Sequence, residues 1–275
     1  MSKSFALALG GGGARGLAHI AVFETLDEIG KKPVAIAGTS IGSLIGAAYA
    51  AGMSGREMRR FLIALAHDRA GVFRRLISTR ATTLADLFST GLGSAALLDA
   101  ERFCQEFLPK QIPDDFGELK IPLTVIATDL HRRRQAVFSC GPLKPALAAS
   151  IALPTLMRPV VIGDRVLIDG AATNPLPFEH LFGQADIVAA IDLSGEPAEK
   201  RHDIPNPLES VLTTILIMGS AITAEKIKHS APALIIRPRI GTFRAIDFLQ
   251  ASAILRACEP MKVEIKEKLA ALLAD

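Results

Sequence analysis

Short apolar runs alternate with helical patterns along most of this chain. The run "SFALAL" (4–9) is almost entirely apolar, which is typical of a strand buried on both faces. The segment after it, 16–30, has apolar residues at helical spacing and ends at Gly30, a residue that suits a helix C-terminus. The next run, "PVAIAGTS" (33–40), predicts a second strand, and a helix is expected from Ile41. This alternation predicts an α/β fold with a mostly parallel sheet that helices cover on both faces.

The same alternation continues toward the end of the chain. Further strands are predicted at 122–130, 135–139, 186–193 and 233–238, with a hairpin at 159–169 that turns at Gly163 and Asp164. Further helices are predicted at 99–108, 144–151, 208–228 and 259–273. We expect one domain, 1–275, with the functional motifs within 5–193 and a helical part at 205–275. The segment 67–98 mixes basic, small and isolated apolar residues, and we expect it to cap a site.

Two uncharged apolar runs raise the question of a membrane span. The run 33–55 is long enough to cross a bilayer, but it is rich in Gly and Ala and starts as a strand. We interpret it as a strand that leads into a buried helix. The run 211–224 is too short to span a bilayer and predicts another buried helix. The apolar stretch before the glycines is too short for a signal peptide, so a cytoplasmic location is expected.

Composition narrows the classes of partner. The chain has 275 residues and a formal net charge of +3, which leans weakly toward anionic partners and is no signature of nucleic-acid binding. With no Trp and one Tyr, it lacks the aromatic residues of a base-stacking surface. Its cysteines, Cys104, Cys140 and Cys258, form no CxxC pair and give no metal-ligand spacing. We therefore expect a reducing compartment, no metal and no nucleic-acid partner.

Four consecutive glycines follow the first predicted strand. The stretch "GGGARG" (11–16) fits GxGxxG, the phosphate-binding pattern of dinucleotide-binding domains. That pattern needs an acidic residue at the end of the second strand to bind the ribose, but Gly38, Thr39 and Ser40 stand there. A dinucleotide-dependent oxidoreductase is therefore only an alternative, and no cofactor is expected.

The second predicted strand ends in "GTSIG" (38–42), a GxSxG motif at a strand-to-helix turn. In this context the serine has strained backbone angles, and its neighbours two residues away must be small. The helix that follows directs its positive end toward the site. Ser40 is therefore predicted to be a nucleophile, the alternative being a serine that only caps the helix.

A serine nucleophile needs an oxyanion hole and a base. The amides of the glycine run are unobstructed by side chains and lie at a neighbouring strand end, where they can bind an oxyanion. None of the later histidines follows a strand in a loop suited to catalysis. Asp129, Asp169 and Asp192 all follow strands, and only Asp169 precedes Gly-Ala and the loop "TNPLP", which can turn toward another strand.

In this order, "GGGARG", "GTSIG" and "DGA" resemble the motifs of the patatin-like phospholipase family. The similarity extends through "IPLTVIATDL", "ASIALP" and "VLIDGAATNPLP" and covers residues 5–193. It implies a three-layer α/β sandwich and a dyad without histidine, with Ser40 as the nucleophile and Asp169 as the base. It also implies an oxyanion hole and a set of supporting glycines. The residues of the oxyanion hole are Gly11, Gly12, Gly13 and Arg15. The supporting glycines are Gly38, Gly42 and Gly170.

The resemblance predicts a serine lipid acyl hydrolase that acts on a phospholipid, a lysophospholipid or another fatty-acyl ester. A lipid-binding or regulatory module with an inactive dyad is the alternative from another class. An unperturbed aspartate, with a pKa of about 3.9, is a poor base for serine. We therefore expect a dry, apolar site that raises the pKa of Asp169.

Two positions depart from the family pattern. Gly10 stands at a position where the motif of many family members resembles "SGGG", with a serine before the three glycines. The small polar contact of that serine is therefore absent here. A basic run, His131 followed by Arg132, Arg133 and Arg134, replaces a glycine-containing turn. This run is either a contact for the anionic inner face of a membrane or a solvated hairpin turn.

Overall fold

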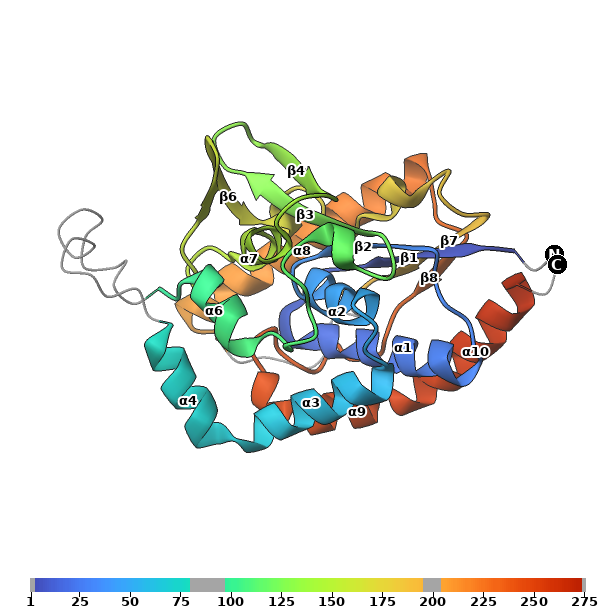
Figure 1. The fold of residues 1–275 in the computed structure, drawn as a ribbon, viewed down its shortest axis with the longest axis horizontal. Coiled ribbons are helices and arrows are strands. Elements are labelled where there is room, and N and C mark those ends of the chain that lie inside the picture. Colours follow the sequence, from blue (N-terminus) through green and yellow to red (C-terminus); the bar gives the residue numbers. More distant parts are fainter. Residues whose placement is uncertain (1–2, 80–96, 195–203, 274–275) are drawn as a thin grey trace.

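The chain folds around a mixed β-sheet, which Figure 1 draws as arrows. The computed structural model describes residues 3–79, 97–194 and 204–273. Within these ranges eight strands form the sheet in the order β5-β6-β3-β2-β1-β7-β8, and β4 pairs with β3. The strands are β1 (Phe5–Leu9), β2 (Ala35–Thr39), β3 (Leu123–Asp129), β4 (Arg134–Phe138), β5 (Val160–Ile162), β6 (Arg165–Asp169), β7 (Ile187–Ile191) and β8 (Leu234–Ile236).

The pairing confirms the predicted, mostly parallel sheet. Strands β3, β2, β1, β7 and β8 are parallel neighbours, whereas β4, β5 and β6 add antiparallel pairs at one side. Thr39, at the end of β2, lies opposite Ile126 of β3. Asp169, at the end of β6, lies opposite the next residue, Ala127. Because β2 runs parallel and β6 antiparallel to β3, the C-terminal ends of the two strands meet along β3.

Helices cover both faces of the sheet and complete the expected three-layer α/β sandwich (Figure 1). On one face, Phe5, Leu7 and Leu9 of β1 belong to the main hydrophobic core. On the other face, Ala6 and Ala8 belong to a smaller core. The α-helices are α1 (Ala18–Glu28), α2 (Ile41–Ala50), α3 (Gly55–His67), α4 (Arg69–Ser78), α6 (Ala100–Phe107), α7 (Leu143–Ile151), α8 (Pro207–His229), α9 (Ala251–Ala257) and α10 (Glu259–Leu273).

The side chains of the two cores explain this layering. The main core includes residues of α1, α2, α7, α9 and α10, which pack on the large side chains of β1. The smaller core includes Phe178 and Leu181 of the short helix η5 (Phe178–Leu181), with Ile227 of α8 packed against it. The alternation of large and small residues along β1 thus places the bulk of the helices on one face of the sheet.

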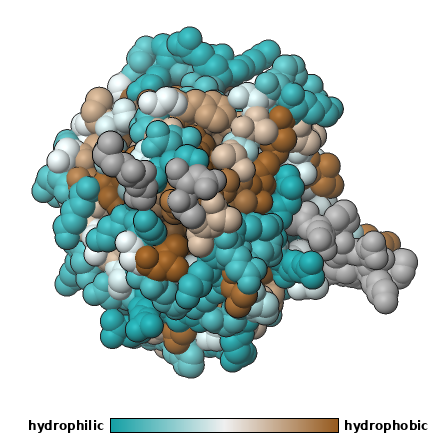
Figure 2. Space-filling model, turned by 90° about the vertical axis from the view of Figure 1, so that its right-hand side faces the viewer, coloured by the Kyte–Doolittle hydropathy of each residue, from teal (hydrophilic) through white to brown (hydrophobic). Residues whose placement is uncertain are grey.

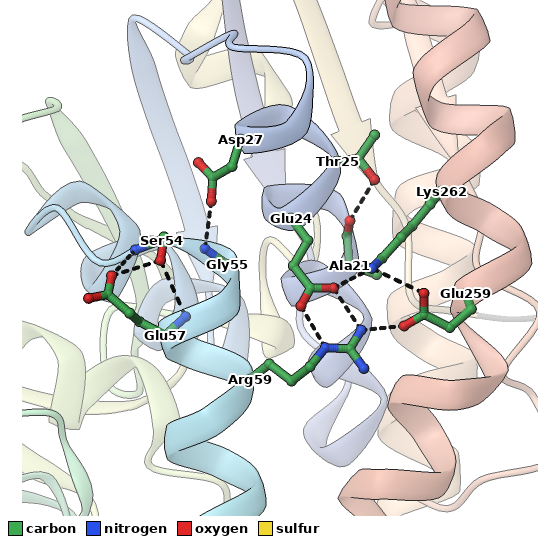
Figure 3. A network of polar contacts seen from close by, with 10 residues as sticks. All are labelled: Ala21, Glu24, Thr25, Asp27, Ser54, Gly55, Glu57, Arg59, Glu259 and Lys262. Carbon is green, nitrogen blue, oxygen red and sulfur yellow. Dashed lines mark hydrogen bonds and ion pairs between the residues drawn. The ribbon is translucent and has the colours of Figure 1, made fainter.

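An ion-pair network ties α1 to α3 and α10 (Figure 3). The buried carboxylate of Glu24 accepts two hydrogen bonds from Arg59, at 2.6 and 2.7 Å, and pairs with Lys262 at 2.6 Å. Glu259 contacts both of these cations. Burial by itself raises the pKa of Glu24, but hydrogen bonds from Arg59 and Lys262 hold this pKa below its usual value. The network fixes α3 and α10 against the first helix of the sandwich.

One prediction from the apolar runs is wrong. The run 33–55 divides into β2 and the largely buried α2, as expected, but 211–224 lies in α8, most of which is not buried. In the described part of the chain, α8 alone is long and apolar enough to cross a membrane, by length and composition only. Its buried residues are Leu212, Gly219 and Thr223. Of the other apolar residues of α8, Ile215 and Leu216 line a cavity and Ile217 and Met218 are exposed, so the apolar sequence alone did not show which of them are buried.

Candidate active site

Ser40 lies at a sharp turn between β2 and α2. Its backbone angles, φ 54° and ψ −127°, are rare for a residue with a side chain and confirm the strain expected of a nucleophile elbow. The turn is so tight that a Cβ on Gly38 would lie 2.7 Å from Gly42, and one on Gly42 would collide with the carbonyl of Leu9. Of the three predicted supporting glycines, Gly38 and Gly42 are therefore required by close backbone contacts at this turn.

Ser40 and Asp169 meet where β2 and β6 end. The Ser40 Oγ donates a hydrogen bond to Asp169 Oδ2 at 2.6 Å. The other carboxylate oxygen, Oδ1, accepts from the amide of Ala171 at 2.8 Å. A Cβ on Gly170 would collide with the carbonyl of Ile126, so the residue after Asp169 has to be small. The sequence motifs and the sheet register thus bring this serine and this carboxylate into direct contact.

The environment of Asp169 makes its carboxyl more basic. The residue is 2% exposed, and burial raises its pKa to about 6. Hydrogen bonds from Ser40 and from the amide of Ala171 oppose this rise because they favour the ionised form. The predicted upward shift of the pKa is therefore confirmed. A carboxylate with a pKa near 6 can accept a proton and still be ionised at neutral pH.

The other two strand-end aspartates have different partners. Asp129 accepts hydrogen bonds from the backbone and the guanidinium of Arg132, which hold its pKa below the usual value. Asp192 accepts from Arg237 at 2.9 Å and from the hydroxyl of Ser194. Neither is hydrogen-bonded to Ser40, and the ion pairs within the described residues include none to Asp169. Of the three carboxylates, only Asp169 is arranged to act on the serine.

The glycine run lies beside Ser40, but not all of its amides are free. A Cβ on Gly11 would lie 3.4 Å from the Cβ of Ser40. The Gly11 amide already donates to the carbonyl of Pro175 at 3.0 Å, and the amide of Ala14 donates to Ala245. Among the described residues, the amides of Gly12 and Gly13 have no such partner. The structure therefore narrows the predicted set of oxyanion donors to these two.

Arg15 holds neighbouring loops together. Its Nε donates to the carbonyl of Phe243 at 2.8 Å, and Nη1 donates to that of Ser194 at 3.3 Å. Burial lowers the pKa of its guanidinium. These contacts fix the glycine run against two loops, and none of them is to Ser40 or Asp169. Arg15 thus supports the predicted oxyanion hole and does not face it.

Gly10, which the sequence leaves unexplained, has two structural roles. A Cβ at this position would lie 2.9 Å from the carbonyl of Ile191, closer than packed atoms allow. Its own carbonyl accepts a hydrogen bond from Nε2 of the buried His19 at 2.9 Å. Burial lowers the pKa of His19 to about 4, so this imidazole is neutral. His19 therefore anchors the start of the glycine run.

Sequence analysis missed the residues that hold the elbow in place. The amide of Ser40 donates to Ser150 Oγ at 2.9 Å, and Ser150 in turn donates to the carbonyl of Ile126. The hydroxyl of Thr39 donates to the carbonyl of Asn174, in the loop after Asp169. Ser150 and Asn174 lie in "ASIALP" and "DGAATNPLP", two segments of the family resemblance. Their positions were therefore visible in the sequence, but their contacts were not.

A long side chain from α8 also reaches this loop. Lys226 donates to the side-chain carbonyl of Asn174 and to the backbone carbonyl of Leu176, and it pairs with Glu179 at 2.6 Å. Burial lowers the pKa of Lys226, while Glu179 opposes this shift. The C-terminal half of α8 is thus fastened to the loop that carries the candidate base.

An apolar cavity of about 400 Å³ adjoins Ser40, Asp169 and the glycine run. Side chains of α2, α3, α4, α6 and α8 contribute to its wall, together with residues of the loops between the strands and helices. Val72 and Leu76 of α4 belong to the segment 67–98 that was expected to cap the site. Residues 80–96 of that segment lie outside the described residues, so the cap stays a prediction. Within residues 3–79, 97–194 and 204–273, no three His, Cys, Asp or Glu residues are grouped to hold a metal ion.

Comparisons with known proteins agree with the motifs. The family model "Patatin-like phospholipase" matches residues 7–182. An uncharacterized NTE family protein of Mycobacterium tuberculosis is 35% identical over 223 residues, which make up 80% of this chain and 58% of that protein. The lysophospholipase NTE1 of Yarrowia lipolytica is 26% identical over 278 residues, 92% of this chain and 19% of that protein. The chain thus spans less than two thirds of the length of these relatives.

Among solved structures, VipD from Legionella pneumophila aligns with a TM-score of 0.49 at 13% identity. The alignment covers 97% of this chain and 67% of VipD. The full-length ExoU of Pseudomonas aeruginosa, in complex with SpcU, aligns with a TM-score of 0.46 at 14% identity, over 100% of this chain and 53% of ExoU.

Proposed function

The chain belongs to the patatin-like phospholipase family, and from this premise we propose that it is a serine lipid acyl hydrolase with Ser40 as nucleophile and Asp169 as base. One observation carries the proposal: the hydrogen bond of 2.6 Å from Ser40 Oγ to Asp169 Oδ2, next to an apolar cavity. The strained angles of Ser40 and the raised pKa of Asp169 support it further.

In the proposed reaction, Ser40 Oγ attacks the carbonyl carbon of a fatty-acyl ester as its proton passes to Asp169. The carbonyl oxygen becomes an oxyanion, which the amides of Gly12 and Gly13 and the positive end of α2 stabilise. The carbon–oxygen bond of the ester then breaks, and the leaving alcohol takes the proton from Asp169. Water attacks the acyl-serine in the same way, with Asp169 as the base, and releases the fatty acid and Ser40.

The proposed substrate class is a phospholipid, a lysophospholipid or another fatty-acyl ester, because the cavity beside Ser40 is lined mainly by apolar side chains. We further propose that the protein works as a peripheral protein at the anionic inner face of a membrane. A contact through Arg132, Arg133 and Arg134 stays an untested prediction. Arg132 and Arg133 lie in an exposed turn between β3 and β4, Arg134 is the first residue of β4, and Arg132 is already paired with Asp129 and Asp164.

Labelling with a fluorophosphonate probe tests the nucleophile. We expect the probe to label the wild-type protein and not Ser40→Ala. Ser139→Ala, a matched change at an exposed serine outside the site, should be labelled like wild type. If folded wild-type protein is neither labelled nor able to hydrolyse a soluble ester, the proposal is wrong. A bound fatty acid without turnover would then favour the lipid-binding module, and binding of NAD(P)H would favour the oxidoreductase.

A further inference from the structure

The mouth of the cavity is bordered by exposed apolar side chains, which we call the rim surface. On α4, Phe73 is 65% exposed and Ile77 is 48% exposed. Ile246 also lines the cavity and precedes the short helix η6 (Phe248–Gln250), in which Phe248 and Leu249 are 46% and 56% exposed. Large apolar side chains that gather at one exposed place mark an interaction surface more often than scattered ones do.

The rim surface is continuous with the cavity. On α4, Val72 and Leu76 line the cavity, and each is followed directly by an exposed residue of the rim. The three rim residues at η6 line the cavity and are exposed at the same time. No residue of α4 is buried, although this helix has an apolar stripe. Among the residues that the structure describes, none buries this stripe, which borders the cavity beside the candidate active site.

Positive charge accompanies these apolar residues. Together, α3 and α4 carry six arginines against Glu57 and Asp68. Arg59 and Arg75 are paired with carboxylates, whereas Arg69 and Arg74 flank the apolar stripe of α4 and form no ion pair among the described residues. An apolar face edged by arginines is the arrangement of helices that lie in the interface of an anionic bilayer.

The end of the molecule that carries the termini and the turn between β3 and β4 lack this combination. Figure 2 shows the end of the molecule where both termini lie, and hydrophilic residues predominate there. In Figure 1, α4 lies at the opposite end from the termini. The turn that carries Arg133 and Arg134 is basic, but it does not line the cavity. Helix α8 also has exposed apolar residues, Ile217 and Met218, directly after the cavity-lining Leu216, but this helix carries no arginine.

We propose that the rim surface docks on an anionic lipid bilayer, so that an acyl chain passes from the bilayer into the cavity without crossing water. Phe73 and Ile77 enter the apolar layer, and Arg69 and Arg74 contact lipid phosphates. This inference rests on the proposed function for the identity of the substrate, but the docking itself requires no turnover. It places the entrance of the cavity against the membrane in which a lipid ester would reside.

Flotation with lipid vesicles tests the docking. All binding measurements use the Ser40→Ala background, so that lipid is not consumed. We expect tighter binding to vesicles of phosphatidylcholine mixed with phosphatidylglycerol than to phosphatidylcholine alone, and weaker binding at high salt. Arg69→Gln combined with Arg74→Gln should weaken binding to the anionic vesicles roughly 30-fold, about fivefold per charge. Phe73→Ser combined with Ile77→Ser should weaken binding to both vesicles at least about tenfold.

Two matched controls locate the surface. Val263→Ser removes an apolar residue of α10 that is 62% exposed, and Arg133→Gln combined with Arg134→Gln removes two charges from the β3–β4 turn. Both should bind vesicles like their parent. The proposal is overturned if the rim variants bind normally, or if the turn variant loses binding instead. It is also overturned if the parent is a dimer that the Phe73→Ser, Ile77→Ser variant splits, because the surface would then join two copies.

Hydrolysis of a short, soluble ester separates this inference from the proposed function. In the wild-type background, the rim variants should hydrolyse the soluble ester at the wild-type rate, because none of the substituted residues lines the cavity. A variant that loses this activity as well is misfolded or altered at the site, which contradicts a role confined to docking. If wild type itself has no esterase activity, the proposed function fails, while the vesicle measurements still decide the docking.

Discussion

Replacing Asp169 by Asn removes the charge of the candidate base and keeps the shape of its side chain. The carbonyl of Asn can accept from the amide of Ala171, and its amino group can donate to Ser40 Oγ, so both contacts of Asp169 have a counterpart. The substitution therefore isolates the cost of ionising a carboxyl group in this buried place.

The size of this cost follows from two pKa values. The pKa of Asp169 is about 6 in the folded chain and 3.8 for an unperturbed aspartate. The difference corresponds to about 3 kcal/mol. As the pH rises from about 4 to about 6, the unfolded chain releases this proton while the folded chain keeps it, so the native state loses stability. Above about pH 6 the group is ionised in both states, and the full cost remains.

We therefore expect Asp169→Asn to be more stable than wild type by about 3 kcal/mol at about pH 8, with a difference that shrinks as the pH falls toward about 4. Urea unfolding at a series of pH values measures this difference. Hydrolysis of a soluble ester by wild type should decline as the pH falls below about 6, because Asp169 must be ionised to accept the proton. The variant should be inactive at every pH.

Asp129→Asn is the matched control at a neighbouring strand end. Hydrogen bonds from Arg132 lower the pKa of Asp129, so its contribution to stability is present at neutral pH and is lost as the pH falls. This variant should be less stable than wild type at neutral pH, and the difference should vanish in acid. The reasoning on Asp169 is refuted if Asp169→Asn is no more stable than wild type at about pH 8, or if its advantage does not change with pH.

Two further predictions concern the frame around the site. Gly42→Ala places a Cβ against the carbonyl of Leu9 and should destabilise the fold by about 3 kcal/mol in urea unfolding. Gly117→Ala is the control, because its Cβ meets only a side-chain oxygen at 3.3 Å. Equal unfolding midpoints for the two variants would contradict the strained elbow. Glu24→Gln leaves Arg59 and Lys262 without their buried carboxylate and should cost about 3 kcal/mol at neutral pH. Because the pKa of Glu24 is lowered, this loss should shrink in acid, and a loss independent of pH would show that charge pairing is not its cause.

The features that sequence analysis predicted correctly are those that a local pattern determines. The buried strands follow from short apolar runs, and the sharp turn at Ser40 follows from two glycines that flank it within five residues. The end of α1 follows from Gly30, which has a positive φ of 65°. Helix α3 also has a local signal that was missed, a capping box formed by Ser54 and Glu57.

The features that it could not predict depend on residues far apart in the chain. The amide of Gly11 donates its hydrogen bond to the carbonyl of Pro175. The number of free amide donors in the glycine run therefore depends on a loop more than 160 residues away. Arg15 belongs to a motif, but its partners are the backbones of Ser194 and Phe243. The apolar composition of α8 is visible in the sequence, but tertiary packing decides whether its apolar side chains face a core or a cavity.

The meeting of β2 and β6 along β3 has a consequence for how this protein can change. Thr39 and Asp169 pair with adjacent residues of β3, so backbone register sets the spacing of the proposed dyad. A slip of one residue would turn Asp169 to the opposite face. Insertions at the hairpin turn of Gly163 leave that register intact. Helix α4 contributes Val72 and Leu76 to the cavity wall but takes no part in this register, so the shape of the cavity can change through α4 while the contact between Ser40 and Asp169 is kept.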